Sequence, residues 1–443
     1  MDLNHSESPG ASFSSAADSP SIPLYSGPNT SPTSWSIILM VFIGIGVFVF
    51  LPYLLIYTVV QIFKHTPRKA FPSEHTYITN TEAGSVSDPL PLHQTWEYLT
   101  ETEVKANFKS GNKSSSILSS LLEKSRSKSI ALENDIIELS LIVPCYNETE
   151  RLHLLLEDAI PVLNLLYPTT TDNQNNTQTT TKSTTPKWEL LLVDDGSSDG
   201  TAEYAVKWAA EQHTSGKLYL PPGTLRVVKL EKNRGKGGAV AHGMMHFRGK
   251  YAIFADADGA SKSDDIRRLL TSISKKVLNN TNASDLLSTE NTAWQYPVVA
   301  IGSRAHMVKT DAVVNRSFIR NFLMYGLHAL VFIFGIRTIG DTQCGFKMFT
   351  RSAALSIFPY MHTEGWIFDV EILIIAMRNL IPVLEVPISW HEVAGSKVEL
   401  ARDSIKMAID LVVMRLAFIL GVYSDGSASS SSYSKSKKTL KRD

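Results

Sequence analysis

The feature that most constrains this chain is a long stretch without charge near its N-terminus. No charged residue occurs between Asp18 and Lys64, and residues 35–63 read WSIILMVFIGIGVFVFLPYLLIYTVVQIF. A helix crosses a bilayer with about 20 apolar residues, so this run is long enough to span with some tilt, and membrane helices tolerate a proline such as Pro52. We therefore predict a transmembrane anchor over residues 35–63. A cleaved signal peptide is the competing interpretation, but no Lys or Arg precedes the run and the run is too long.

The charges that flank this run predict its orientation. Residues 1–63 contain no Lys or Arg, whereas Lys64, Arg68 and Lys69 follow the run directly. Positively charged flanks remain in the cytosol. We therefore expect a short lumenal N-terminus, with everything after Lys64 on the cytosolic side.

The overall composition argues against other classes of protein. The chain contains 43 Lys and Arg against 43 Asp and Glu, so no global basic field points to nucleic acid as a partner. Cys145 and Cys344 are too few for a disulfide framework and lack metal-ligand spacing. In the cytosol both thiols would stay reduced. The sequence gives no indication of the oligomeric state.

Shifts in composition divide the chain into five predicted regions. These are a disordered N-terminus (1–34), the anchor (35–63), a juxtamembrane linker (64–135), a globular domain (136–423) and a disordered, basic tail (424–443). Two polar, low-complexity loops interrupt the domain, at residues 168–186 and 278–294.

Within the globular domain, short apolar runs rich in β-branched residues alternate with helical patterns. The runs are LSLIVP (139–144), WELLLVDD (188–195), TLRVVKL (224–230), KYAIFAD (250–256) and PVVAIGS (297–303). Runs of this kind are typical of buried parallel strands, and their alternation with helices predicts an α/β fold with a mostly parallel sheet. In such sheets ligands bind at the carboxyl ends of the strands.

One of these strand ends carries a pair of carboxylates. Asp256 and Asp258 close the run KYAIFAD and flank Ala257. Residues i and i+2 of an extended segment point to the same side, so the two side chains can converge on one cation. Carboxylates together with substrate phosphates favour Mg²⁺ or Mn²⁺. A turn with solvated carboxylates remains the alternative, since two aspartates alone are a weak signal.

A glycine-rich segment follows another strand and precedes a helical pattern. Residues 233–239 read NRGKGGA. Glycines let the backbone approach a ligand, and a helix N-terminus attracts anions. The segment is not a Walker loop, because no Ser or Thr follows Lys236 and the glycine spacing differs. A glycine-rich turn without a ligand is the other interpretation of this segment by itself.

Taken together, the motifs resemble a known family. VPCYNE, VDDGSSDGT, NRGKGGAV and ADADGA occur in the order found in family 2 glycosyltransferases of GT-A fold, and DTQCGFK (341–347), GWIFDVE (365–371) and WHEVAGSK (390–397) continue the resemblance. It covers roughly residues 138–420. The branch that transfers glucose from UDP-glucose to dolichyl phosphate at the endoplasmic reticulum is most similar. Gly259-Ala260 stands where the mannosyl branch typically has Leu-Gln.

The resemblance implies roles for individual residues. The nucleotide-sugar residues would be Pro144, Tyr146, Glu148, Asp194, Asp195, Lys236 and Asp256, with Asp194 and Asp195 at the uracil or ribose. Asp256 and Asp258 would hold the metal. The catalytic residues would be Asp258, Asp341, Arg304 and Arg320, the two arginines meeting the acceptor phosphate and Asp341 facing the metal and the sugar. A simple ion pair with a surface carboxylate is the alternative for either arginine.

Two late apolar segments suit a lipid acceptor. Residues 322–336 are too short for a comfortable span, and residues 405–423 are apolar apart from Lys406, Asp410 and Arg415. We expect both to lie in the membrane interface as amphipathic helices. Buried core helices, or one further span, are the alternatives.

Other functions remain open on the sequence. A relative of the same fold would use GDP-mannose or UDP-N-acetylglucosamine and another polyprenyl phosphate. An inactive, membrane-tethered scaffold that binds nucleotide sugars is an alternative of a different class. The intact charged set at Asp256, Asp258, Arg304 and Asp341 favours an enzyme.

Overall fold

The computed structural model describes the long N-terminal apolar helix and most of the globular domain. The described residues are 32–93, 137–168, 186–279, 293–307, 336–391 and 400–426, with residues 326, 330 and 393. The chain falls into two compact units, one ending at Val59 and the other beginning at Val60.

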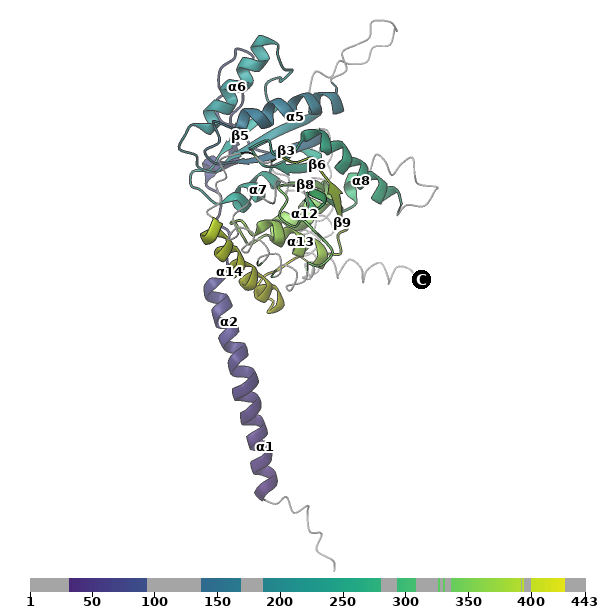
Figure 1. Ribbon diagram of the computed structural model, residues 1–443. Coiled ribbons are helices and arrows are strands. Elements are labelled where there is room, and N and C mark those ends of the chain that lie inside the picture. The colour runs from purple at the N-terminus through teal and green to yellow at the C-terminus, as the bar shows by residue number, and fades with distance from the viewer. Residues whose placement is uncertain are drawn as a thin grey trace, which may run out of the picture. The chain divides into compact units, whose positions relative to one another are not determined.

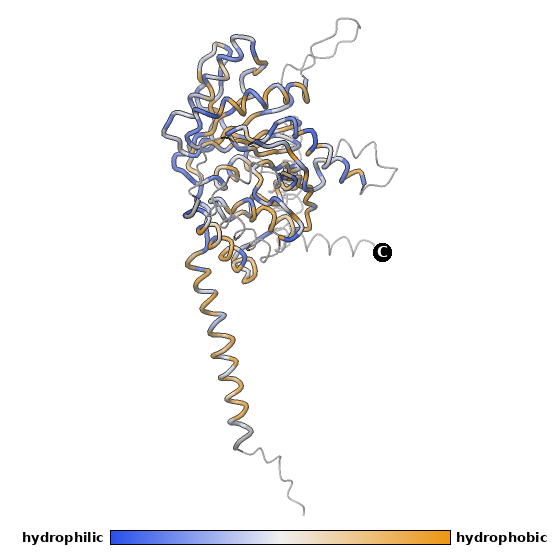
Figure 2. The backbone as a smooth tube through the Cα atoms, in the orientation of Figure 1, coloured by the Kyte–Doolittle hydropathy of each residue, from blue (hydrophilic) through white to orange (hydrophobic). Residues whose placement is uncertain are grey.

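The first unit is helical where it is described. Helix α1 (Pro32–Ile45) leads through a π-helical turn (Gly46–Phe50) into α2 (Leu51–Phe63). Pro52 lacks an N–H, and this gives a reason for a wider turn just before it. Residues 35–63 form the one helix among the described residues that is long and apolar enough to cross a membrane, and Figure 2 shows its hydrophobic colour along most of its length.

The second unit contains a seven-stranded sheet in the order β5-β4-β3-β6-β8-β7-β9. Its strands are β3 (Ile137–Cys145), β4 (Trp188–Asp194), β5 (Leu225–Lys229), β6 (Gly249–Ala255), β7 (Val299–Ser303), β8 (Phe346–Thr350) and β9 (Val383–Pro387). Figure 1 labels five of these strands, β5, β3, β6, β8 and β9. Six strands run in one direction, and β8 alone pairs antiparallel with both of its neighbours. The predicted α/β class with a mostly parallel sheet is confirmed.

Alternate side chains of the buried strands divide the core into two layers. On β3, Leu141 and Val143 face one layer, and Ile142 faces the other. The first layer is formed with helices α5 (Leu152–Leu166), α6 (Thr201–Ser215) and α8 (Ile266–Leu278). The second is formed with α7 (Lys236–Met244), α12 (Arg351–Ile357), α13 (Phe368–Arg378) and α14 (Leu400–Ile419).

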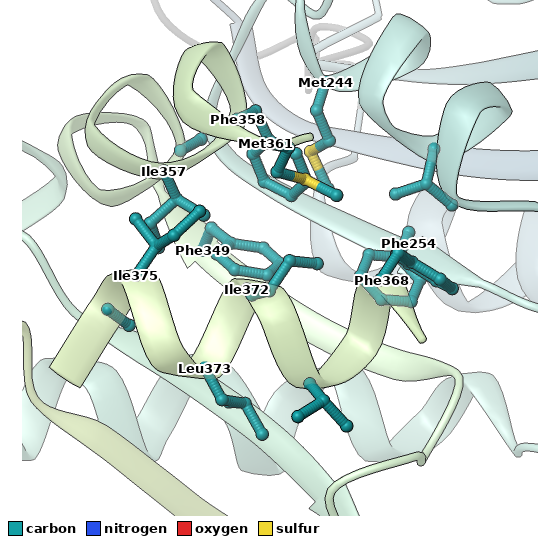
Figure 3. Packing of buried hydrophobic residues seen from close by; sticks show 14 of the residues in the cluster. Met244, Phe254, Phe349, Ile357, Phe358, Met361, Phe368, Ile372, Leu373 and Ile375 are labelled. Carbon is teal, nitrogen blue, oxygen red and sulfur yellow. The ribbon is translucent and has the colours of Figure 1, made fainter. Parts of the chain in front are cut away.

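Aromatic packing fixes α13 against the strands that lead to the predicted site. Phe254 of β6 lies 5.7 Å, between ring centroids, from Phe368 at the start of α13. It lies 6.1 Å from Phe349 of β8, and Figure 3 shows these rings beside Ile372 and Ile375 of α13. Because Phe254 is two residues before Asp256, this packing also holds the end of β6 in place.

Residues 64–93 belong to the same compact unit as the sheet, although composition assigned residues 64–135 to a linker and began the globular domain at residue 136. They form a 3₁₀ turn (Pro72–His75) and the short strands β1 (Thr76–Tyr77) and β2 (Leu90–Pro91). Next to β1, Ile78 forms an antiparallel bridge with Val227 of the edge strand β5. Polar composition gave no sign of this docking, because backbone hydrogen bonds, ion pairs and a few scattered apolar side chains, such as the buried Leu92, hold the segment.

Helix α14 covers most of the second late apolar segment. Its residues Leu411, Met414, Ala417 and Phe418 are buried in the core, while Ile405, Ile409 and Ile419 are more than half exposed. The helix is therefore amphipathic, and part of it is a core helix. Residues 322–336 lie outside the described residues except for Gly326, Leu330 and Ile336.

Candidate active site

The carboxyl ends of the strands bring most of the predicted site residues to one edge of the sheet. Cys145 at the end of β3 is in register with Asp194 at the end of β4, and Ala255 at the end of β6 is in register with Phe346. Phe346 is the first residue of the antiparallel strand β8, so the segment that precedes β8 reaches this same edge. The predicted residues located here are Pro144, Tyr146, Glu148, Asp194, Asp195, Asp256, Asp258, Arg304 and Asp341.

The carboxylate pair follows β6 and faces a lysine. Lys236, the first residue of α7, places its Nζ 2.5 Å from Asp256 Oδ1. That oxygen is buried and has no hydrogen bond of good geometry, so the contact is an ion pair without an aligned hydrogen bond. Asp258 Oδ1 accepts a hydrogen bond from the Ala260 backbone at 3.0 Å. A Cβ at Gly345 would overlap the Asp256 carboxylate, so only glycine allows this approach of the segment before β8.

Neighbouring charges keep Lys236 protonated. Burial alone would lower its pKa, but the carboxylates of Asp256 and Asp369 raise the pKa above its ordinary value. Asp369 forms a short ion pair with Lys347, which is fully buried and also donates to the Cys344 carbonyl at 2.7 Å. Lys347 lies in the motif DTQCGFK and Asp369 in GWIFDVE, but the sequence alone predicts a role for neither residue.

The carboxylate pair fits a metal that is shared with a substrate. Among the described residues, no three His, Cys, Asp or Glu side chains converge to hold a metal ion. Mg²⁺ is usually held by one or two carboxylates plus substrate phosphates, and Mn²⁺ favours the same oxygen ligands. Asp256 already attracts a cationic group in this structure, the Lys236 ammonium. The donor set therefore fits Mg²⁺ or Mn²⁺ held jointly with phosphate oxygens.

Asp195 fixes the glycine-rich turn between β5 and α7. Its Oδ1 accepts from the backbone N–H of Arg234 at 2.6 Å, and its Oδ2 accepts from that of Gly235 at 2.9 Å. Gly235 has a φ of +88°, and a Cβ there would collide with the Glu364 carbonyl, so the turn requires glycine. Burial raises the pKa of Asp195 to about 7, against the lowering effect of these two N–H groups. Asp194 is also buried, which raises its pKa, and it accepts from Ser197 N at 3.0 Å.

The predicted nucleotide residues after β3 differ in how accessible they are. Tyr146 is 43% exposed at the edge of the sheet, whereas Glu148 is buried. Arg151 donates to both Glu148 oxygens, at 2.9 and 2.8 Å. Glu148 N donates to Thr201 Oγ1 at 2.9 Å, linking this segment to the start of α6. The Glu148 carboxylate therefore already has a cationic partner, and Tyr146 is the more accessible side chain.

Arg304 and Asp341, which the sequence placed on different substrates, contact each other. The guanidinium donates from Nε to Asp341 Oδ2 at 2.7 Å and from Nη2 to Oδ1 at 2.9 Å. The Arg304 backbone N–H also donates to Oδ2 at 2.9 Å. Burial alone would raise the pKa of Asp341, but Arg304 holds it below its ordinary value. This pair corresponds in part to the simple ion pair considered above, although Asp341 is buried and not on the surface.

Glu385 of β9 accepts hydrogen bonds from residues in and beside this pair. Its Oε1 accepts from the Asp341 backbone at 3.0 Å and from Ser303 Oγ at 2.6 Å, and its Oε2 accepts from Gly340 N at 2.9 Å. Trp390, which follows β9, lies with its ring 5.6 Å from the Arg304 guanidinium. Arg320 lies outside the described residues.

Two further charged residues join the glycine-rich turn to the loop before α13. Arg234 donates from Nε at 2.8 Å and from Nη2 at 2.5 Å to the same oxygen of Glu364. Trp366, two residues further along this loop, has its ring 5.6 Å from Lys236 Nζ. Arg234 and Lys236 belong to the motif NRGKGGAV; Trp366 belongs to GWIFDVE, and Glu364 directly precedes it. Only the fold shows that the two motifs are in contact.

One cavity, of about 430 Å³, borders part of the predicted site. Its lining includes Tyr77, Asp194, Ser197 and Lys229, but neither Asp256 nor Asp258.

A family model of known proteins matches the part of the chain that contains these strand ends. The family model described as "Glycosyl transferase family 2" matches residues 140–280, which include the ends of β3, β4 and β6. The resemblance to family 2 glycosyltransferases that the motifs predicted is confirmed, and with it the GT-A type of α/β fold.

Curated relatives narrow the family. The dolichyl-phosphate beta-glucosyltransferase of Saccharomyces cerevisiae is 47% identical over 84% of this chain and 91% of its own length. The human protein of the same name is 38% identical over 65% of this chain and 77% of its own length. This chain belongs to the dolichyl-phosphate β-glucosyltransferase family. A crystal structure of glucosyl-3-phosphoglycerate synthase from Mycobacterium tuberculosis with UDP, 16% identical, covers 65% of this chain and 82% of its own at a TM-score of 0.38, which is too low to add to the assignment.

Proposed function

We propose that this protein transfers glucose from UDP-glucose to dolichyl phosphate, giving dolichyl β-D-glucosyl phosphate for the assembly of lipid-linked oligosaccharides in protein N-glycosylation. The observation that carries the proposal is membership of the family over nearly the full length of the yeast relative. Asp256, Asp258 and Arg304 at one sheet edge supply the charges that the reaction needs. A mannosyl donor is not favoured, because the curated relatives named above share the glucosyl name.

The donor would occupy the ends of β3, β4 and β6. Asp256 and Asp258 are the residues that would hold Mg²⁺ or Mn²⁺ together with the diphosphate. When bound, such an ion would offset the charge that develops on departing UDP. Lys236, at the N-terminus of α7 and kept protonated by Asp256, would neutralise phosphate charge from the other side. Tyr146 and Asp195 would border the nucleoside.

The acceptor needs alignment and not deprotonation. A phosphate monoester has a second pKa of about 6, so dolichyl phosphate is largely dianionic near neutral pH and is itself a competent nucleophile. Its oxygen would attack C1 of glucose as the bond from C1 to the UDP oxygen breaks, which inverts the α-linked donor to a β-linked product. The work of the chain's own residues is to position the two anions and to neutralise their charge.

Arg304 is the residue that would bring the acceptor phosphate to the donor. A guanidinium presents five N–H donors, and the pair with Asp341 uses two of them. Asp341 and Glu385 together would hold the guanidinium at a fixed position while its other donors meet phosphate. Arg320 would be a second contact of this kind.

Helix α14 would lie at the membrane surface beside this site. His65, two residues after the end of α2, places Nε2 3.1 Å from Asp410 of α14, and its backbone N–H donates to Tyr423 Oη at 2.6 Å. The middle of α14 and the residues just after its end therefore lie next to the segment that follows α2, and the exposed face of the helix carries Ile405, Ile409 and Ile419. Gln343, two residues after Asp341, contacts Met407 of the same helix. A lipid-facing helix in contact with the acceptor side suits a polyprenyl substrate.

A donor comparison tests the function. Purified full-length protein should transfer label from UDP-[¹⁴C]glucose to dolichyl phosphate, and transfer should need a divalent cation. Preferential turnover of GDP-mannose or UDP-N-acetylglucosamine would reassign the donor. Binding of UDP without turnover of any donor would favour the inactive scaffold.

We further propose that the protein is a single-pass protein of the endoplasmic reticulum with its domain in the cytosol, where nucleotide sugars are made. The basis is the absence of Lys and Arg before residue 64 and the basic residues directly after it. Protease added to sealed microsomes should digest the domain. The sequons expected on the cytosolic side should carry no glycan; they are those of Asn112, Asn147, Asn175, Asn279, Asn282 and Asn315. Asn4 and Asn29 lie in sequons on the predicted lumenal side. Glycan on Asn175 would reverse the orientation.

A further inference from the structure

The segment directly after the membrane anchor contains a buried carboxylate that holds two parts of the fold together. Glu74 is fully buried in the 3₁₀ turn Pro72–His75. Arg68 donates to both of its oxygens, from Nη1 at 2.8 Å and from Nη2 at 2.5 Å. Burial alone would raise the pKa of Glu74, but Arg68 and backbone N–H groups lower it to about 2, so the carboxylate is charged. A buried bidentate pair of this kind is geometrically specific.

The same pair also contacts the glycine-rich turn. Glu74 Oε1 accepts from the Glu231 backbone at 2.9 Å, and Arg68 Nη2 donates to the Lys232 carbonyl at 3.0 Å. The contact continues in the other direction, because Arg234 Nη2 donates to the Arg68 carbonyl at 3.0 Å. Three residues of the turn are therefore bonded to Arg68 or Glu74.

The turn held in this way belongs to the proposed donor site. The backbone N–H groups of Arg234 and Gly235 in this turn donate hydrogen bonds to Asp195. The next residue, Lys236, forms the ion pair with Asp256. The Glu74 carbonyl is also 2.9 Å from Nε2 of His242, one and a half turns further along α7. A shift of residues 68–74 would move the turn and the start of α7 together.

We infer that Arg68 and Glu74 are positioning residues for the nucleotide-sugar donor: they lock the turn at residues 231–235 and with it the placement of Asp195 and Lys236. The inference rests on the proposed function, since it concerns the same donor site. Arg68 is only five residues after Phe63, so the chain keeps it within about 18 Å of the end of the anchor helix. The pair thereby connects the segment directly after α2 to the proposed donor site.

Two substitutions test the pair in full-length protein. Glu74→Gln keeps the shape but replaces one acceptor oxygen with a donor that faces other donors. Arg68→Lys keeps the charge but loses the bidentate geometry. Each should raise KM for UDP-glucose and the Kd for UDP about tenfold, which corresponds to about 1.4 kcal/mol. KM for dolichyl phosphate should change less than about twofold, because Arg304, which would meet that substrate, is held by Asp341.

Glu189 offers a matched control. It is equally buried and charged, with a pKa lowered to about 2, and it is paired with Arg248 at 2.8 Å, but it lies at the amino end of β4, opposite the site. Glu189→Gln should lower thermal stability and leave KM for UDP-glucose unchanged.

The possible outcomes separate the two proposals. An unchanged UDP affinity in Arg68→Lys, or an equal loss in Glu189→Gln, would overturn the positioning role, and Arg68→Lys decides the matter alone if Glu74→Gln does not fold. If the wild-type protein fails to turn over UDP-glucose, the proposed function fails instead, and calorimetric titration with UDP still measures the effect of the pair.

Discussion

The two halves of the catalytic edge are held by different kinds of bond. At the ends of β4 and β6, backbone N–H groups hold most of the carboxylates: Asp195 accepts two of them, and Asp194 and Asp258 accept one each, while Asp256 pairs with Lys236. At the end of β7, the charged side chains of Arg304 and Asp341 hold each other through two bonds, and the Arg304 backbone adds one more. Backbone donors come with the fold and cannot change partner, whereas a guanidinium can share its donors with an arriving phosphate. We therefore expect a donor half that is preformed and an acceptor half that adjusts to its substrate.

The largest effect should come from removing one charge in the donor half. Asp258→Asn keeps an oxygen for the Ala260 N–H but loses the negative charge that would hold the metal. By analogy with the loss of one electrostatic stabiliser at other active sites, kcat should fall by about two to three orders of magnitude. The measurement is transfer of labelled glucose, with thermal unfolding as the control for folding. Near-normal turnover at saturating metal would refute the metal role.

A substitution in the acceptor half should change kcat/KM for dolichyl phosphate more than KM for UDP-glucose. Arg304→Lys keeps the positive charge but loses the two parallel bonds to Asp341, so the acceptor phosphate is held less well. We expect kcat/KM for dolichyl phosphate to fall about tenfold to a hundredfold, as for the loss of about 1.4–2.8 kcal/mol. KM for UDP-glucose should stay within about twofold of wild type, because backbone bonds hold the donor residues. An equal rise in both KM values would show that the two halves are not separate.

A smaller effect should appear as pH dependence in the donor half. Burial raises the pKa of Asp195 to about 7 from its ordinary 3.8, so the folded protein binds this proton more tightly than the unfolded chain does. Protonation replaces an acceptor with an O–H that faces the turn's N–H groups, so KM for UDP-glucose should rise as pH falls from 8 to 6. Asp195→Asn should have a higher KM that is independent of pH in this range.

The stability of the fold should depend on pH in the opposite direction from UDP-glucose binding, which provides a second measurement. Because the folded pKa exceeds the unfolded one, this group's contribution to stability declines as pH rises from about 4 to 7 and then levels off. The difference in free energy of unfolding between wild type and Asp195→Asn should therefore shift in favour of the variant over this range. A constant difference would mean that Asp195 titrates normally and that its N–H bonds outweigh its burial.

The smallest effect should come from a segment that serves neither half. Residues 169–185 lie outside the described residues and fall in sequence between α5 and β4, and β4 begins at the end of the sheet away from the proposed site. Long polar loops add little to the entropy of closure, so deleting these residues should change activity less than about twofold. Expression level and UDP affinity are the measurements. Loss of either would show that the segment is an ordered part of the domain.

The local parts of this site were predictable because their signals are local. The run KYAIFAD predicts both a buried strand and a carboxylate at its end. In the fold, Asp256 and Asp258 directly follow strand β6. The same holds for Asp194 and Asp195 at the end of β4 and for Lys236 at the start of α7. Strand periodicity and the family motifs were sufficient to place these residues, and the long apolar helix followed from length and apolar content alone.

What the sequence could not provide is the pairing of distant residues. Arg304 and Asp341 were both identified but assigned to different substrates. The sequence does not show that these two residues, 37 positions apart, form an ion pair with each other. Residues 64–93 looked like a polar linker because their composition is polar, but in the fold Leu92 enters the core, and ion pairs and backbone bonds add further contacts to the domain. The sequence by itself determined the long apolar helix, the α/β class and the acidic strand ends, because each is encoded within one short segment. Only the tertiary structure decided that Glu74 lies against the glycine-rich turn, because a buried charge is satisfied by whichever groups the fold brings to it.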